Sequence, residues 1–368
     1  MGTVENNGLL SVFCGAGGLD LGFEEAGFDV KLAFDIRPDA IVSHNANRAG
    51  RAKSAFCVDV RSLTLKRLDE LAGGTFKPIG IIGGPPCQSF SQANRSPVDD
   101  DPRHELPFVY ANLIDRLNKR SPLQFFVLEN VVTLREDPHV EHYEKLKRKL
   151  AKIGFHVHEE ILNSSDYGVP QNRERLVLVG LNKKLYTKDS WTRPAKVDLP
   201  VEQLTVRHAF RGLPEPTHFR QKLVANEIAF HPNHWCMAPK SKKFTTAGAL
   251  VEGQRGNRSF KTLSWDQPSV TVAYGNREVH IHPDCKRRLS VLEAMRLQGF
   301  PDTYELKGTL SSQITQVSEA VPPPMAKAVA LGLKRVMTAA PAKKHPKAKT
   351  RPAPASVPRD KVLAAEPA

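Results

Sequence analysis

The chain has 368 residues, of which 40% are hydrophobic and 25% charged, and its formal net charge is +14. This composition is typical of a globular protein large enough to bury one or two cores, and no apolar run reaches the roughly 20 residues that span a bilayer. The N-terminus has no secretory pattern, and the five cysteines are widely spaced without CxxC pairs. We therefore expect reduced thiols in a cytosol, without disulfides, a zinc site or another metal.

The positive charge is concentrated in two places. Residues 183–280 hold 16 Lys and Arg against 8 Asp and Glu, and residues 340–368 hold 7 against 2. The remainder of the chain is nearly neutral. Since Lys and Arg that neutralise phosphates release counterions, this asymmetry slightly favours a nucleic-acid partner over a basic surface that is merely solvated.

Strands and helices alternate in the first half of the chain. Short apolar runs predict strands at 9–13, 30–35, 79–84, 125–130 and 175–181. Amphipathic stretches between them predict helices at 19–26, after Pro38 and at 141–154. This alternation indicates an α/β fold with a doubly wound, mostly parallel sheet covered on both faces.

The pattern changes after Asn182. Residues 183–280 are basic, punctuated by Pro and Gly, and short of helical periodicity, whereas helices are predicted again at 287–300 and 323–339. The Ala-, Pro- and Lys-rich end is predicted to be disordered. We expect four parts, with bounds at 1–182, 183–286, 287–339 and 340–368.

The first motif, FCGAGG, begins at Phe13 between a predicted strand and a predicted helix. Its glycines allow a ligand to approach the backbone, and a helix N-terminus favours a carboxylate or phosphate, although a plain tight turn would look the same. Asp35 ends the second strand, where an acid can bind ribose hydroxyls, and Asp59 follows a third apolar stretch. A helix cap is the alternative for either acid. The set predicts an adenosine-bearing cofactor.

The second motif, GGPPCQSFS, places Cys87 in a loop after the strand at 79–84. Ligands of open α/β sheets bind at this edge, and two prolines would stiffen the loop that presents the thiol. A buried cysteine is usually a small core residue, but Pro, Gln and Ser neighbours do not fit a core. We interpret Cys87 as a nucleophile.

Two further motifs carry charged groups to strand ends. Glu129 ends the apolar strand at 125–130, so burial should raise its pKa and make it a proton donor unless it is a solvated loop acid. In QNRER, Arg173 and Arg175 alternate at the start of a strand and should point the same way, toward a phosphate or a base carbonyl. A salt-bridged strand end is the alternative.

In this order, these blocks, with RRLSVLEAMRLQGFPD and QVSEAVPPP, resemble bacterial C5-cytosine-specific DNA methyltransferases over residues 9–335. The resemblance implies a Rossmann-like fold that binds S-adenosyl-L-methionine and a target-recognition domain at 183–286. It implies a bacterial, cytoplasmic enzyme that acts as a monomer on double-stranded DNA, with a cognate restriction endonuclease as a further partner. It implies cofactor contacts from Phe13, Gly15, Ala16, Gly17, Gly18, Leu19, Asp35, Ile36, Asp59, Val60 and Pro85.

The resemblance also implies the catalytic roles. Cys87 adds to C6 of a flipped-out cytosine, Glu129 contacts N3, Arg175 contacts O2, Arg173 supports the site, and Pro86 shapes the loop. DNA contacts are expected from Gln88, Ser89 and Ser91. Groove readers are expected in two Gly-containing stretches of the basic segment, at Arg255, Asn257, Arg258, Asn276 and Arg277, each of which could instead touch only phosphate.

Three positions depart from the family pattern. Ser11 stands where an acid is usual, Ile36 where an aromatic residue is frequent, and Ser318-Glu319 where Gly-Asn is common. Two other functions stay open at this point: an RNA cytosine methyltransferase and a non-catalytic DNA-binding protein. A nicotinamide-dependent dehydrogenase is disfavoured, because FCGAGG lacks the dinucleotide spacing.

Overall fold

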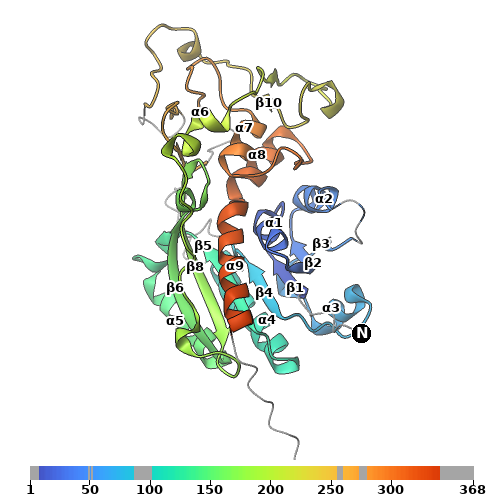
Figure 1. Cartoon of the computed structure of the whole chain (residues 1–368). Coiled ribbons are helices and arrows are strands. Elements are labelled where there is room, and N and C mark those ends of the chain that lie inside the picture. Colours follow the sequence, from blue (N-terminus) through green and yellow to red (C-terminus); the bar gives the residue numbers. More distant parts are fainter. Residues whose placement is uncertain are drawn as a thin grey trace, which may run out of the picture.

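A computed structural model describes residues 8–48, 50, 53–86, 102–254, 260–272 and 280–339. Across these residues, seven strands form the main sheet, in the order β3-β2-β1-β4-β5-β8-β6 (Figure 1). Their bounds are Gly8–Val12 (β1), Asp29–Asp35 (β2), Ala55–Cys57 (β3), Gly80–Gly83 (β4), Phe125–Asn130 (β5), Phe155–Asn163 (β6) and Glu174–Asn182 (β8). The predicted strands are therefore confirmed to within two residues at each end.

The sheet is parallel from β3 to β5, but β8 runs antiparallel to both β5 and β6. The expectation of a mostly parallel sheet is confirmed, and the sequence did not indicate where it would become antiparallel. The connection from β6 to β8 is short and contains no crossover helix. A parallel pair needs a crossover of a dozen or more residues, so this connection returns the chain antiparallel.

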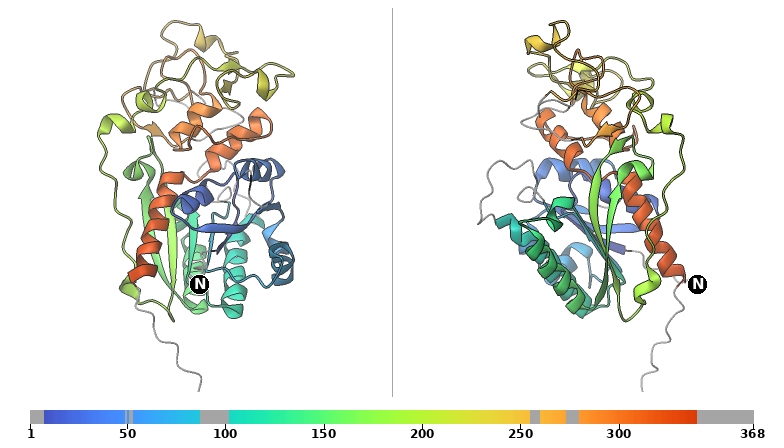
Figure 2. Two further views of the ribbon diagram at one scale, coloured as in Figure 1. Left: turned by 45° about the vertical axis from the view of Figure 1, so that its right-hand side comes forward. Right: turned by 90° about the vertical axis from the view of Figure 1, so that its left-hand side faces the viewer.

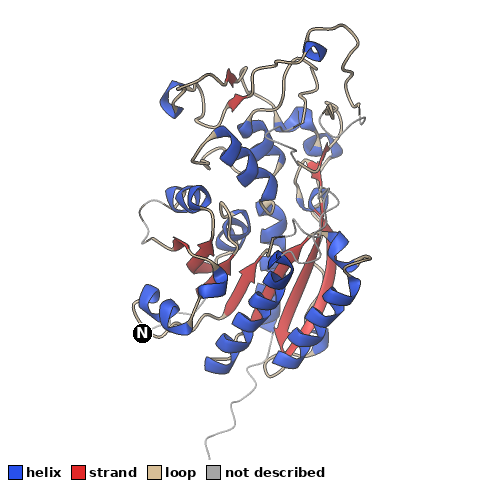
Figure 3. Ribbon diagram, turned by 180° about the vertical axis from the view of Figure 1, so that it is seen from behind, coloured by secondary structure: helices blue, strands red, loops and turns tan. Residues whose placement is uncertain are grey.

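Helices cover both faces of the sheet. Their bounds are Gly18–Glu25 (α1), Pro38–Ala46 (α2), Leu65–Ala72 (α3), Leu106–Arg120 (α4), Val140–Ile153 (α5) and Pro323–Ala339 (α9). One buried cluster joins the sheet to α1 and α9, and a second joins its other face to α3, α4 and α5. Figure 3 shows helices on the face opposite to α9. The doubly wound arrangement is confirmed.

We call residues 183–286 the loop-rich segment. Its first part packs beside the sheet, where Tyr186 and Trp191 join the first buried cluster, and its described residues from 206 onward lie beyond one end of the sheet (Figure 2). Its regular elements are short: Val206–Ala209 (α6), Thr217–His218 (β9), Trp235–Cys236 (β10) and Ser269–Val270 (β11). It shares a third buried cluster with Val291–Leu297 (α7) and Leu310–Glu319 (α8). The last of the two-residue strands, β11, pairs in parallel with Gln171–Asn172 (β7).

The helix predicted at 287–300 is shorter than expected. Residues 287–289 are not helical, and Arg288 forms an isolated bridge to Ile281. The reason is a capping box in which Ser290 accepts from the backbone N–H of Glu293 while the Glu293 side chain accepts from the N–H of Ser290. This pair starts α7 at Val291. The helix at 323–339 is found as predicted.

The chain end from residue 340, predicted to be disordered, lies outside the described residues. Among the described helices, none combines the length and apolar character needed to cross a membrane.

Candidate active site

The FCGAGG turn joins β1 to α1 in a tightly enclosed backbone. Phe13 takes a positive φ of 55°, a sparsely populated conformation for a residue with a side chain, and Gly17 takes 93°. A Cβ on Gly18 would collide with the carbonyl oxygen of Val321, just before α9. The turn is therefore held between β1 and the C-terminal part of the chain, and its close packing explains the glycine at position 18.

Asp35, at the carboxyl end of β2, braces this turn. Its two carboxylate oxygens accept hydrogen bonds from the backbone N–H groups of Gly15 and Arg37, each at 2.9 Å. Asp59 lies beyond the end of β3, where it caps a short 3₁₀ turn, Val60–Ser62, and pairs with Arg61. The helix-cap alternative thus describes part of what Asp59 does, while both acids still face one cavity.

Behind the turn lies a buried polar network that the sequence did not predict. Asp20, in the first turn of α1, accepts from the Ser11 hydroxyl at 2.6 Å, and its other oxygen lies 2.8 Å from His44 Nε2. All three side chains are fully buried. Ser11 stands where the resemblance led us to expect an acid on this strand. In this chain Asp20 supplies a carboxylate to the same buried group, nine residues later.

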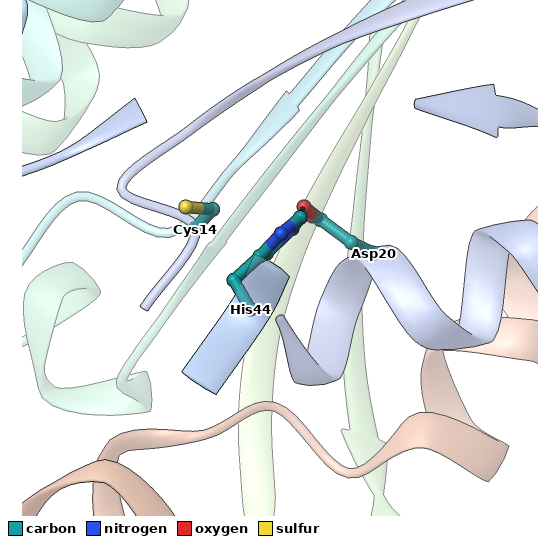
Figure 4. Close-up of side chains that lie close together, drawn as sticks. All are labelled: Cys14, Asp20 and His44. Carbon is teal, nitrogen blue, oxygen red and sulfur yellow. Dashed lines mark hydrogen bonds and ion pairs between the residues drawn. The ribbon is translucent and has the colours of Figure 1, made fainter. Parts of the chain in front are cut away.

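Cys14 completes this buried group (Figure 4). Its sulfur, a carboxylate oxygen of Asp20 and a ring nitrogen of His44 all lie within 4.8 Å of one another. Burial and, to a lesser extent, the negative charge of Asp20 and Asp35 raise the pKa of the Cys14 thiol well above its usual range. A thiol held in its neutral form is a poor nucleophile, so Cys14 acts as a packing residue.

Glu129 is positioned by the end of β5 and by its antiparallel neighbour. Arg175 on β8 reaches across to it, with its Nε 3.0 Å from a carboxylate oxygen of Glu129. Burial raises the pKa of Glu129, while Arg175 and Arg173 act in the opposite direction. Glu129 is therefore a buried carboxyl group that holds a proton more readily than a solvated one, as the sequence predicted.

The turn after β4 is tied to the same strand end. The Asn130 side-chain amide donates to the backbone oxygen of Pro85 at 3.1 Å. A Cβ on Gly84 would lie 2.9 Å from a carboxylate oxygen of Glu129, so any larger residue here would displace that carboxylate. Pro85 and Pro86 therefore leave β4 beside Glu129. Sequence reasoning missed Asn130 as an anchor, although it lies in the same ENV motif.

Arg173 and Arg175 have separate partners. The guanidinium of Arg173 is almost fully buried and donates to the backbone oxygen of Ser318 at 2.9 Å, in α8. Arg175 pairs with Glu129 instead. Both arginines line the cavity that contains Glu129, so they point the same way, as predicted. Arg173 ties the site to α8, which agrees with the supporting place expected for it.

One cavity of about 460 Å³ brings most of these groups together. It is lined by the predicted residues Phe13, Gly15, Ala16, Gly18, Leu19, Asp35, Ile36, Asp59, Val60, Pro85, Pro86, Glu129, Arg173 and Arg175. Gly17 is the exception among the described ones, since it faces His44 and Tyr304 behind the turn. A second, larger cavity of about 940 Å³ contains residues that begin β1 and β2, away from the carboxyl edge where such folds bind ligands.

The remaining predicted residues lie outside the described residues. They are Cys87, Gln88, Ser89, Ser91, Arg255, Asn257, Arg258, Asn276 and Arg277. The described residues next to them show where the chain enters and leaves these stretches. Pro86, directly before Cys87, lines the cavity that also contains Glu129.

The other two departures from the family pattern meet at the rim of this cavity. Arg37 forms an ion pair with Glu319, the residue that stands in place of the usual asparagine. The side chain of Ile36, between Asp35 and Arg37, is 62% exposed and lines the cavity without being enclosed. This ion pair connects the end of β2 to the end of α8 across the cavity.

The comparisons with known proteins agree with this geometry. The family model described as C-5 cytosine-specific DNA methylase matches residues 8–335. The chain belongs to this family. Its enzyme class is DNA (cytosine-5-)-methyltransferase.

Similar proteins cover most of the chain. Type II methyltransferase M.NmeDI of Neisseria meningitidis is 34% identical, over 89% of this chain and 83% of its own length. Type II methyltransferase M.MthTI of Methanothermobacter thermautotrophicus is 31% identical, over 90% and 98%. A crystal structure of a DNA modification methyltransferase encoded in an Escherichia coli prophage is 26% identical, with a TM-score of 0.73, over 90% of this chain and 99% of that chain. The C5-cytosine methyltransferase family and the Rossmann-like methyltransferase fold predicted from the motifs are thus confirmed.

Proposed function

We propose that this methyltransferase binds S-adenosyl-L-methionine in the 460 Å³ cavity. The residues present fit that group: the backbone of the FCGAGG turn opens onto the cavity at the N-terminus of α1, and the carboxylates of Asp35 and Asp59 face it. Backbone N–H groups at a helix N-terminus suit the carboxylate of the cofactor, and strand-end acids suit ribose hydroxyls and an adenine amino group. When bound, the cofactor supplies a methyl group made electrophilic by its sulfonium.

We further propose that Cys87 is the nucleophile and that Glu129 and Arg175 stabilise the charge developing on the base. The Cys87 thiolate would form a bond to C6 of cytosine, which moves the ring electron pair toward C5. Arg175 would hold O2, and the protonated carboxyl of Glu129 would donate to N3. Once C5 carries the methyl group that the cofactor supplies, loss of the C5 proton and of the Cys87 thiolate would restore the aromatic ring.

The pairing of Glu129 with Arg175 at 3.0 Å is the observation that carries this proposal. It brings a proton donor and a cation together in a cavity that also contains the FCGAGG turn and Asp35. A base inside a duplex cannot reach such a site, so the cytosine has to flip out, at a cost of about a few kcal/mol.

The loop-rich segment would select the DNA site. Thr262 N donates to Gln254 O at 3.1 Å, just outside residues 255–259, and His280 Nε2 lies 2.9 Å from Thr271 O, just outside residues 273–279. A backbone hydrogen bond, donated by Leu263 N–H to Ile281 O, joins the residues that flank the first stretch to those that flank the second. The described residues on either side of the two stretches expected to contact the DNA groove are therefore connected to one another. Exchange of residues 183–286 with a relative of different specificity should transfer the site preference.

The proposed division of labour follows the expected bounds. Residues 1–182 and 287–339 would bind cofactor and cytosine, and 183–286 would read double-stranded DNA. We propose that the enzyme acts as a monomer in a bacterial cytoplasm, as the modification half of a restriction-modification pair with a cognate endonuclease.

A trapping experiment tests the covalent chemistry. Purified protein is incubated with S-adenosyl-L-methionine and duplex DNA containing 5-fluorocytosine, which has no C5 proton to lose. We expect a denaturation-resistant protein–DNA adduct for the wild type and none for Cys87→Ala. The same incubation with tRNA tests the RNA alternative. An adduct on tRNA alone, or none with any duplex that wild-type protein methylates, would overturn the proposal.

A further inference from the structure

Gln171, the first residue of the QNRER motif, lies at a junction of three chain segments. Its side chain is fully buried. Its Oε1 accepts from the backbone N–H of Val272 at 2.8 Å, and its Nε2 donates to Leu297 O at 3.0 Å and to Gln298 Oε1 at 3.1 Å. The amide thus joins β7 to the loop-rich segment on one side and to the end of α7 on the other.

The connection continues through a second buried amide. Gln298 Nε2 donates to the backbone oxygen of Val317 at 2.7 Å, in α8. The next carbonyl, that of Ser318, accepts from the guanidinium of Arg173 at 2.9 Å. Two residues after Gln171, the chain therefore returns to the same group of contacts. Hydrogen bonds therefore lead from Gln171 through Gln298 and the end of α8 to Arg173, and the backbone between Arg173 and Gln171 closes the ring.

The loop-rich segment meets this ring along its backbone. Ser269 and Val270 of β11 pair in parallel with Gln171 and Asn172, and the Thr271 hydroxyl donates to Asn172 O at 3.1 Å. Residues 269–272 are thus attached to the strand that leads directly to Arg175. A displacement of β11 would move the entry to β8, and with it the arginine that pairs with Glu129.

We propose that Gln171 is a positioning residue that couples the loop-rich segment to the Arg175–Glu129 pair, so that site selectivity and turnover depend on the same amide. The inference rests on the proposed function of the loop-rich segment as the DNA reader. In a buried hydrogen-bond network the loss of one member leaves its partners unsatisfied, so the segments it held can shift relative to one another. A residue that only filled space would not link selectivity to turnover.

Two substitutions separate the two sides of the junction. Gln171→Leu removes every hydrogen bond of the side chain. Gln171→Glu keeps an acceptor for the N–H of Val272, but a carboxylate cannot donate to Leu297 O or Gln298 Oε1. The matched control is Asn182→Leu, because Asn182 is a buried amide at the far end of β8 that bonds Leu123 O at 2.6 Å and Asn118. Asn182→Leu removes a buried amide and its hydrogen bonds but leaves the contacts of Gln171 unchanged.

The measurement is base-resolution sequencing of 5-methylcytosine in plasmid DNA treated with full-length protein and S-adenosyl-L-methionine. It gives the methylation rate at the sequence that wild-type protein prefers and at sites that differ from it by one base. For Gln171→Leu we expect the preferred-site rate and the ratio between the two rates each to fall at least about tenfold, since the loss of even one of its three buried hydrogen bonds corresponds to about a factor of ten. For Gln171→Glu we expect a smaller fall in both, and for Asn182→Leu a wild-type ratio.

A wild-type ratio in both Gln171 variants, whatever their rate, would overturn the inference. If Gln171→Leu does not fold, the ratio for Gln171→Glu decides. Failure of the proposed function gives a different result, since the wild-type protein would then leave no 5-methylcytosine in the plasmid.

Discussion

The catalytic sheet and the loop-rich segment are held together in different ways. In the sheet, β8 pairs with six residues of β5 and nine of β6, so Glu129 and Arg175 are placed by continuous backbone ladders. The described strands of the loop-rich segment are two residues long, and single side chains replace the ladder. Asn233 and Trp235, for example, both bond Gln313 in α8.

In the proposed function, this difference falls between the part that carries the chemistry and the part that reads DNA. A ladder distributes its hydrogen bonds over many residues, so β5, β8 and β6 stay paired when one side chain beside them is lost. The loop-rich segment depends on individual contacts, and each can be removed by one substitution. Each region nevertheless has a buried carboxylate–arginine pair beside it. Glu129 pairs with Arg175 in the sheet at 3.0 Å, and Glu293 pairs at 2.9 Å with Arg287, which directly follows the loop-rich segment and also pairs with Glu215 in it. The two pairs allow a matched test.

The largest expected effect is on catalysis. Glu129→Gln should lower kcat at least about 100-fold, because an amide can donate to N3 but cannot transfer a proton, while the thermal midpoint changes little.

Glu293→Gln should do the reverse and lower the thermal midpoint more than kcat. It removes the negative charge that pairs with the buried Arg287 and one of the two oxygens that accept from it, which we expect to cost about 3 kcal/mol, or about 6 °C in Tm, with kcat retained in the cold. Methyl-transfer rates and thermal melts on the same preparations compare them; equal kcat losses in both variants would contradict the division between the regions.

A second test concerns packing in the catalytic half. A Cβ on Gly22 would lie 2.5 Å from Ala326 Cβ and 2.6 Å from Lys327 N, where α1 meets α9, so neither backbone can give way. We expect Gly22→Ala to cost about 2 kcal/mol by overpacking. Gly74→Ala is the control, because a Cβ there meets no atom within 4 Å. Chemical denaturation measures both, and equal midpoints would show that α1 and α9 are not rigidly packed.

The pH dependence tests the environment of Glu129. Burial raises its pKa, so the ionised form is penalised in the folded protein. If the protonated carboxyl is the active form, kcat/KM should fall as pH rises through that pKa, and Glu129→Gln should lack this limb. The free energy of unfolding changes in the same direction. Once the pH exceeds the unfolded-state pKa of Glu129, the ionised carboxylate makes the folded protein less stable. The Tm of Glu129→Gln minus that of wild type should therefore be more positive at pH 8 than at pH 4; the opposite order would mean that Arg175 dominates.

The smallest effect is expected from the basic chain end. Residues 340–368 carry 7 Lys and Arg against 2 acids. Deletion of 343–368 should leave Tm unchanged and weaken non-specific DNA binding at low salt, with the difference disappearing as salt screens the charge. Melts and salt titrations of DNA binding measure this. A clear fall in Tm at moderate salt would show that this segment packs on the fold.

The sequence by itself determined the strand–helix order of the catalytic half and most of the site. Apolar runs that end in Asp35 and Glu129 indicate strand ends, and parallel strands bring their carboxyl ends to one edge. Local signals therefore sufficed to predict that FCGAGG, Asp35 and Glu129 would share a cavity. The family motifs indicated Arg173 and Arg175 in the same way.

Only the tertiary structure decided the contacts between distant segments. Asp20 forms its bonds with Ser11 and His44, and Gln171 with residues more than 100 positions away. No period or spacing encodes such pairs, because each depends on how separate elements pack. The same holds for Glu319, whose partner Arg37 follows the end of β2. Hydrogen bonds between buried side chains become visible only when the fold has brought both partners to one place.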